Sequence, residues 1–134
     1  MPPKPRARRS LPFREPALSL RDILEGIDMI VQFVRGMDLE AFREDPKTIA
    51  AVERKLLLIS EAAVRLGDDA ERLCPGLPWR NIRGIGNWLR HQYDRVDVET
   101  VWNTVIDHLP QLRSGVLRAL TLPSENEDPT KGST

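Results

Sequence analysis

A group of polar side chains past the middle of the chain has the residue types and the spacing of a site for acid–base chemistry. Asn87 stands four residues before His91, and Arg83 stands four residues before Asn87, so a helix would carry these side chains on nearly one face. Arg90 is adjacent to His91, and Tyr93 follows where this helix is expected to end. An imidazole can move protons near neutral pH, and a guanidinium or an amide beside it can hold a phosphate oxygen.

This combination suits the transesterification of RNA. In that reaction the ribose 2′-hydroxyl attacks the phosphorus while one group takes its proton and another protonates the leaving oxygen. Cations stabilise the charge that develops on the phosphate. The same spacing is also typical of a helix C-terminus that carries cations favourable to the helix dipole. The spacing alone leaves both interpretations open.

Two glycines, Gly84 and Gly86, lie within the same expected helix. A glycine in a helix interior costs roughly 1 kcal/mol of stability relative to alanine. The pair therefore indicates either the close approach of another helix backbone, for example across a dimer interface, or a local distortion of the helix. Both interpretations remain open.

The elements that must position these residues have helical periodicity, and no alternating strand pattern competes with it. The first helix is expected between Ser19, a predicted N-cap, and Gly36, a predicted stop. A short helical turn is expected at residues 38–44. The apolar stripe of the first helix consists of Leu20, Ile23, Leu24, Ile27, Ile30, Val31 and Val34.

The second helix has clear boundaries in the sequence. Asp45 is its predicted N-cap, Pro46 takes the first helical position, and Gly67 ends it. Its apolar residues recur at alternating spacings of three and four, which is typical of a bundle helix. These residues are Ile49, Val52, Leu56, Ile59, Ala63 and Leu66.

The third and fourth helices complete the predicted fold. The third begins at Pro78, after a turn, and carries its apolar stripe through Trp79 and Ile82 toward the polar group. Asp97 caps the fourth, which Pro110 should kink or split because proline lacks the amide and crowds the preceding turn. Four amphipathic helices with short connections predict an all-α protein, an up-and-down four-helix bundle.

Composition divides the chain into three parts: a basic arm at residues 1–17, the helical domain at residues 18–122 and a polar tail at residues 123–134. Both tails are rich in proline and polar residues, so we expect them to be disordered. The arm can touch nucleic acid or an acidic partner, but such arms more often only aid solubility. Lys plus Arg and Asp plus Glu number 20 each, so the net charge indicates no partner.

Several protein classes are excluded by what the sequence lacks. No apolar run approaches the roughly 18 residues of a membrane span, and the basic arm has no apolar core like that of a signal peptide. Cys74 is the only cysteine, which excludes an internal disulfide and a cysteine-based zinc site. His108 has no recognisable partner motif and is assigned no chemical role. We expect a cytoplasmic protein without a metal or a cofactor.

The stretch from Pro78 to Asp97 resembles the signature of the HepT-like ribonuclease family. Members are HEPN-domain toxins that are paired in operons with a MntA-type minimal nucleotidyltransferase antitoxin. The family pattern reads approximately Pro-Trp-Arg-x-Ile-x-Gly-Met-Arg-Asn, then a short spacer, His-x-Tyr and Val-Asp. In the second helix, Ala51-Val52-Glu53-Arg54 and Ile59-Ser60-Glu61-Ala62 resemble the family too, so that the likeness covers roughly residues 18–122.

The resemblance implies a metal-independent endoribonuclease, the toxin of a type VII-like toxin–antitoxin system. Its four-helix bundle would dimerise, with two copies of an Arg-x4-His motif facing each other at a composite cleft. His91 would act in proton transfer and Asn87 would support the site. Tyr93 would accept AMP from the antitoxin, and the bulky anionic nucleotide would exclude RNA from the cleft. The implied partners are RNA, the nucleotidyltransferase and a second copy of the chain; a larger hetero-oligomer remains open.

The chain departs from the family pattern at one position, because Gly86 stands where the family has its motif arginine. Arg83 lies one turn before Asn87 on nearly the same face and is the first candidate to replace that arginine; Arg90 is the second. The alternative is a catalytically weakened interaction module, which binds a nucleotidyltransferase without cleaving RNA.

Overall fold

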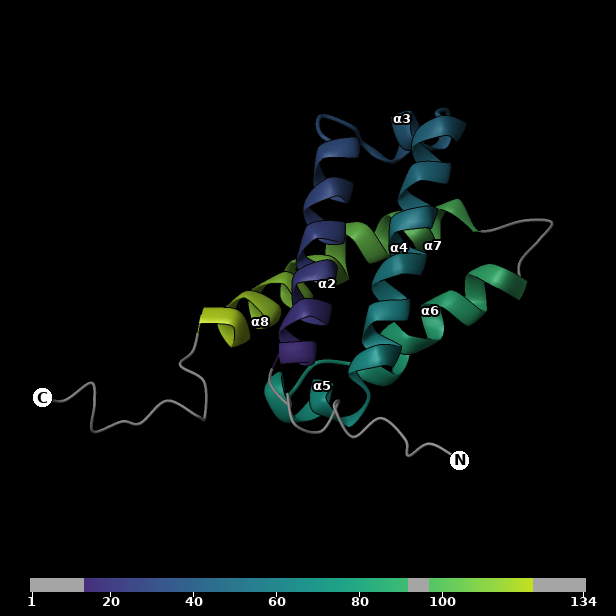
Figure 1. The fold of residues 1–134 in the computed structure, drawn as a ribbon. Helices are drawn as coiled ribbons and strands as arrows, with labels where there is room; N and C mark the ends of the chain where they lie inside the picture. Colours follow the sequence, from purple (N-terminus) through teal and green to yellow (C-terminus); the bar gives the residue numbers. More distant parts are fainter. Residues whose placement is uncertain (1–13, 92–96, 122–134) are drawn as a thin grey trace, which may run out of the picture.

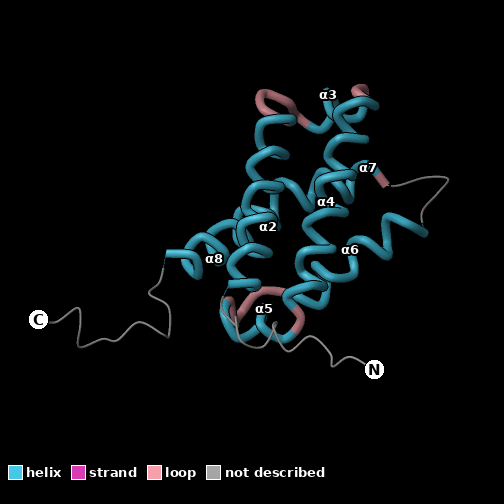
Figure 2. The backbone as a smooth tube through the Cα atoms, in the orientation of Figure 1, coloured by secondary structure: helices cyan, strands magenta, loops and turns pink. Residues whose placement is uncertain are grey.

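The structure, a computed structural model, describes residues 14–91 and 97–121 of the 134-residue chain. All regular secondary structure in these two ranges is helical, which confirms the predicted all-α class (Figure 2). The elements are α2 (Arg14–Phe33), α3 (Leu39–Arg43), α4 (Pro46–Leu66), α5 (Asp68–Leu73), α6 (Trp79–His91), α7 (Val98–Asn103), the π-helical turn η1 (Thr104–His108) and α8 (Leu109–Thr121).

Helices α2 and α4 form the centre of the bundle and run side by side in opposite directions (Figure 1). The segment from α7 to α8 crosses behind this pair, where α8 packs against α2. Helix α6 packs against α4 and then diverges from it toward its own C-terminal end. The end of α6 that carries the polar group therefore lies at the edge of the bundle.

The core consists of the apolar stripes that the periodicity predicted. Among the described residues, twenty-one buried apolar residues form one cluster, to which the long helices contribute most. Phe42 of α3 is one of them and lies against the ring of Trp102, with ring centroids 5.1 Å apart. Val31 is an exception to the predicted stripe, because 47% of it is exposed. The core of the second helix consists of Val52, Leu56, Ile59, Ala62, Ala63 and Leu66.

The predicted start of the first helix was wrong. Helix α2 begins at Arg14, so it reaches into the predicted arm, and Ser19 is a buried residue of its interior rather than its N-cap. Pro16 marks the true start, because a proline in the first turn removes only an amide that has no partner within the helix. At the other end α2 stops at Phe33, and Gly36 takes a positive φ of 79° in the following turn.

The predicted boundaries of the second helix are confirmed. The carboxylate of Asp45 accepts hydrogen bonds from the backbone N–H and the hydroxyl of Thr48, at 3.1 and 2.8 Å. These bonds lower the pKa of Asp45. Pro46 is in the first turn of α4 and Gly67, with φ of 57°, ends the helix. The short helical turn expected at residues 38–44 is α3, whose N-cap is Asp38.

Pro110 disrupts the last helical segment in the way the sequence predicted. The backbone widens into η1, which ends two residues before Pro110, and the N–H of Leu109 donates to the carbonyl of Thr104, five residues earlier. A π-helical turn of this kind accommodates a residue that cannot continue the ordinary bonding pattern. None of the described helices has the length and apolarity needed to cross a membrane.

Candidate functional site

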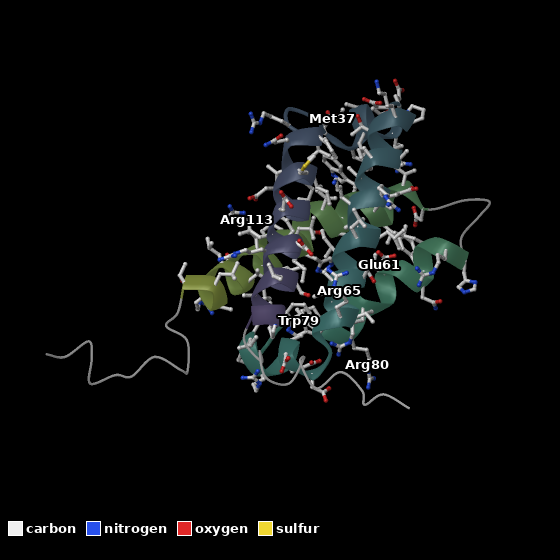
Figure 3. The ribbon with its side chains drawn as sticks, in the orientation of Figure 1. Met37, Glu61, Arg65, Trp79, Arg80 and Arg113 are labelled. Carbon is white, nitrogen blue, oxygen red and sulfur yellow. The ribbon has the colours of Figure 1, made fainter. Side chains whose placement is uncertain are left out.

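Helix α6 is fixed at its start by a buried tryptophan. Trp79 is 1% exposed and lies inside the bundle at the first residue of α6 (Figure 3). Its indole Nε1 donates to the carbonyl of Cys74 at 2.8 Å, so the preceding turn and the helix are held as one unit. Gly76 permits that turn because its φ is 89°. The direction of α6 away from the bundle is therefore set at Trp79.

The middle of α6 is fixed by a hydroxyl from α4. Oγ of Ser60 donates to the carbonyl of Arg83 at 2.9 Å and accepts from the backbone N–H of Gly86 at 2.9 Å. A β-carbon at position 86 would lie 3.0 Å from this oxygen and 3.3 Å from Cδ1 of Leu57. Gly86 is buried, and the absence of its side chain lets α6 approach α4 closely.

The two glycines of α6 therefore have different surroundings. The close approach inferred for the pair is confirmed at Gly86, where the neighbour is α4 of the same chain. Gly84 is exposed, and a β-carbon there would meet nothing within 4 Å. A single explanation for both glycines, either close approach or distortion, does not hold.

His91 and Asn87 lie together on the exposed side of the last turns of α6. His91 is the final residue of the helix, and both side chains are exposed. Their separation of four residues places them on one face, as predicted. Tyr93, the expected AMP acceptor, lies outside the described residues. His108, on η1, is also exposed.

Arg83 is engaged in contacts within the bundle. Its Nη2 lies 2.6 Å from Oε2 of Glu71 and its Nη1 lies 3.4 Å from the carbonyl oxygen of Gly67. The hydrogen bond from Arg83 is the main cause that lowers the pKa of Glu71. The guanidinium is thus directed toward α5, away from the end of the helix where His91 stands. This geometry does not favour Arg83, our first choice from the sequence, as the replacement for the motif arginine.

Arg90, the second candidate from the sequence, lies close to Gly86. Its Nη1 lies 3.5 Å from where a β-carbon of Gly86 would be, so the side chain folds back one turn along α6. The guanidinium lies beside the point from which a side chain at position 86 would start, and Arg90 remains exposed. A ligand can therefore reach this cation next to the position where the family pattern has arginine.

In the part of the chain that the structure describes, no three His, Cys, Asp or Glu side chains are arranged so that they could hold a metal ion. Glu53 is half-buried on α4, and burial raises the pKa of its carboxyl. Burial also raises the pKa of the Cys74 thiol, which disfavours the reactive thiolate.

Two functional contacts were missed by the sequence analysis. Ser60, which orients α6, was only part of a motif in the second helix, and Glu71, which holds Arg83, lies in α5, a helix that was not predicted. The polar Ser60 between apolar positions of α4 and the three acids in the first turn of α5 were the signals available.

The described part of the chain is thus an all-helical bundle in which an exposed histidine ends a helix that has arginines but no acidic residue. The family model described as "Ribonuclease HepT-like" matches residues 23–119, so the chain belongs to the HepT-like family. This result confirms the resemblance inferred from residues 78–97. No solved structure matches the chain significantly.

Curated relatives agree with this assignment. A protein of Thermococcus cleftensis named as a probable ribonuclease HepT is 40% identical over 94 residues, which are 70% of this chain and 86% of the relative. Two proteins of Methanocaldococcus jannaschii that carry RNase in their names are also similar. One is 33% identical over 75% of this chain and 83% of its own length. The other is 34% identical over 77% of this chain and 85% of its own length.

The two glycines of α6 provide a matched test of how it packs. Gly84→Ala should raise the free energy of unfolding by about 1 kcal/mol, because alanine favours the helix and its β-carbon meets open space. Gly86→Ala should lower it despite the same gain in propensity, because Ser60 must shift and weaken its two hydrogen bonds. Urea denaturation of both variants measures the difference. Equal stabilisation by both substitutions would mean that α4 yields to the added methyl.

Proposed function

We propose that the chain is a metal-independent endoribonuclease, the toxin of a type VII-like toxin–antitoxin system. The observation that supports this most is the last turn of α6, where an exposed His91 follows an arginine whose guanidinium lies beside Gly86. A proton-transfer group and an exposed cation at one accessible helix end match what cleavage of an RNA phosphodiester requires. The named relatives point to the same reaction class.

The proposed reaction is an internal transesterification. The ribose 2′-oxygen forms a bond to phosphorus, the bond from phosphorus to the 5′-oxygen breaks, and a 2′,3′-cyclic phosphate and a 5′-hydroxyl result. His91 transfers a proton in this exchange, and Asn87, on the same face, donates a hydrogen bond that orients the phosphate. A second copy of the chain would supply the other histidine, which accounts for the two proton transfers of the reaction.

Arg90 is the arginine that we now assign to the charge on phosphorus. Its guanidinium is exposed beside position 86, whereas that of Arg83 is held by Glu71 and the carbonyl of Gly67. A guanidinium can stabilise the extra negative charge of the transition state by two parallel hydrogen bonds. This assignment reverses the preference for Arg83 that the sequence spacing gave.

Regulation is proposed to act at Tyr93. A nucleotidyltransferase of the MntA type would transfer AMP to its hydroxyl, two residues after His91. The added phosphate and nucleoside would repel and block RNA at the end of α6. The partners are then RNA, the nucleotidyltransferase and a second copy of the chain, and the reaction takes place in the cytoplasm.

The reaction can be tested with the two histidines of the chain. His91→Ala should lower the rate of RNA cleavage about a hundredfold or more, because a proton-transfer group is lost. His108→Ala should leave the rate unchanged, since His108 is exposed on η1, outside α6. Cleavage of a labelled oligoribonucleotide in the presence of EDTA, with detection of the cyclic phosphate, measures both. If wild type does not cleave and does not arrest growth when expressed alone, the chain is the interaction module instead.

The two arginines give a separate prediction. Arg90→Ala should lower kcat about a hundredfold, because the cation beside the reacting phosphate is lost. Arg83→Ala should mainly lower the thermal stability, because it breaks the ion pair between α5 and α6. Glu71→Gln breaks the same pair and should reproduce the Arg83→Ala phenotype. Loss of activity in Arg83→Ala but not in Glu71→Gln or Arg90→Ala would return the catalytic role to Arg83.

Regulation has its own readout, which is the mass of the intact protein. Co-expression with a nucleotidyltransferase of the MntA type should add whole AMP units to the chain, because Tyr93 would be the acceptor. Tyr93→Phe should prevent the addition, so that the RNase stays active in the presence of the nucleotidyltransferase. A nucleotidyltransferase without its metal-binding carboxylates is the control. AMP addition that persists in Tyr93→Phe would move the acceptor to another residue.

A further inference from the structure

Four residues of α6 share one exposed face, which runs from His91 back to the start of the helix. Arg80, Gly84, Asn87 and His91 follow one another at offsets of four, three and four, so the helix places them in a row. All four positions are exposed, and we name this row the outer face of α6. At about 1.5 Å per residue, Arg80 lies about 16 Å along the helix axis from His91. That distance exceeds the length of one nucleotide.

The outer face has one cation that no protein group neutralises in the described part of the chain. Arg80 forms no hydrogen bond or ion pair with a described residue, and Figure 3 shows its side chain directed outward from α6. The other arginines of α6 are turned to different sides, Arg83 toward Glu71 and Arg90 toward Gly86. The outer face therefore presents a single guanidinium at one end and the imidazole of His91 at the other.

The charge around this face favours an anion. The sequence of α6 contains no Asp or Glu, although the chain as a whole has as many acidic as basic residues. Helix α5 carries Asp68, Asp69 and Glu71, and two of these three acids are paired, Glu71 with Arg83 and Asp69 with Arg72. Gly84 lies between Arg80 and Asn87 and offers bare backbone with nothing within 4 Å, so a polymer can lie close to the helix at that point.

We infer that the outer face of α6 is the track along which single-stranded RNA lies, with Arg80 binding a phosphate a few nucleotides away from the bond that is cleaved. This inference rests on the proposed RNase function, since His91 defines the reacting end. Contacts to phosphate position a nucleic acid without reading its sequence. Arg80 is thus a substrate-positioning residue that favours longer RNA over dinucleotides, and it takes no part in the proton transfers.

Binding and chemistry can be separated with an RNA that cannot react. The probe is a labelled oligoribonucleotide with 2′-deoxyribose at the cleaved position, and its affinity is measured at several salt concentrations. Arg80→Ala should weaken binding several-fold and reduce the slope of log K against log salt by about 0.7, the value for one phosphate contact on a single strand. Arg80→Lys should retain most of that slope. Arg35→Ala removes an exposed arginine that follows the C-terminal end of α2, outside α6, and is the matched control.

The position of the phosphate is found by replacing each phosphate in turn with a neutral methylphosphonate. One replacement should weaken binding to wild type and have little effect on binding to Arg80→Ala, so that the two changes are not additive. Additive effects at every position, or equal losses in Arg80→Ala and Arg35→Ala, would overturn the inference. Neither outcome would contradict the proposed RNase function. Wild type that binds the probe without cleaving unmodified RNA would remove the proposed function instead, and the absence of any binding would remove both.

Discussion

The contact between Ser60 and the backbone of α6 decides how the rest of the candidate site is presented. One hydroxyl donates to the carbonyl of Arg83 and accepts from the N–H of Gly86, which fixes both the rotation and the depth of the helix against α4. Because side chains project at fixed angles from a helix, fixing one side determines which residues face solvent. Asn87 and His91 are exposed as a consequence. A larger residue at position 86 would have to displace Ser60 or Leu57.

The same contact explains why the arginines of α6 differ in what they can do. Arg83 lies near the α4–α5 connection, where Glu71 and the carbonyl of Gly67 take up its hydrogen bonds. Arg90 lies one turn beyond Gly86 and is close to the space that a side chain there would use, while Arg80 is directed outward from the bundle. Three residues of one type on one helix thus have a structural, a proposed catalytic and a proposed substrate-positioning role, according to what surrounds each of them.

Much of the fold follows from local chemistry that the sequence displays directly. Asp45, Pro46 and Gly67 bound α4 where predicted, because a cap, a first-turn proline and a glycine with positive φ each depend on neighbouring residues only. The sequence-based predictions were wrong where the structure does not depend on neighbouring residues alone. Ser19 has the type of an N-cap but is buried in α2, and α5 is too short to show periodicity. In both places packing against other helices, rather than local preference, sets the structure.

The sequence by itself determined the all-helical class, the apolar stripes of the core and the polar group around His91, because periodicity and motif spacing are properties of the chain. Membership of the HepT-like family could also be inferred from residues 78–97, and the family match confirms it. Only the tertiary structure decided which arginine is accessible. Helical spacing favoured Arg83 over Arg90, and this order is reversed because Glu71, twelve residues before Arg83 and on another helix, holds the guanidinium of Arg83. Spacing along a helix gives the direction of a side chain, whereas its partners come from whatever the fold brings alongside.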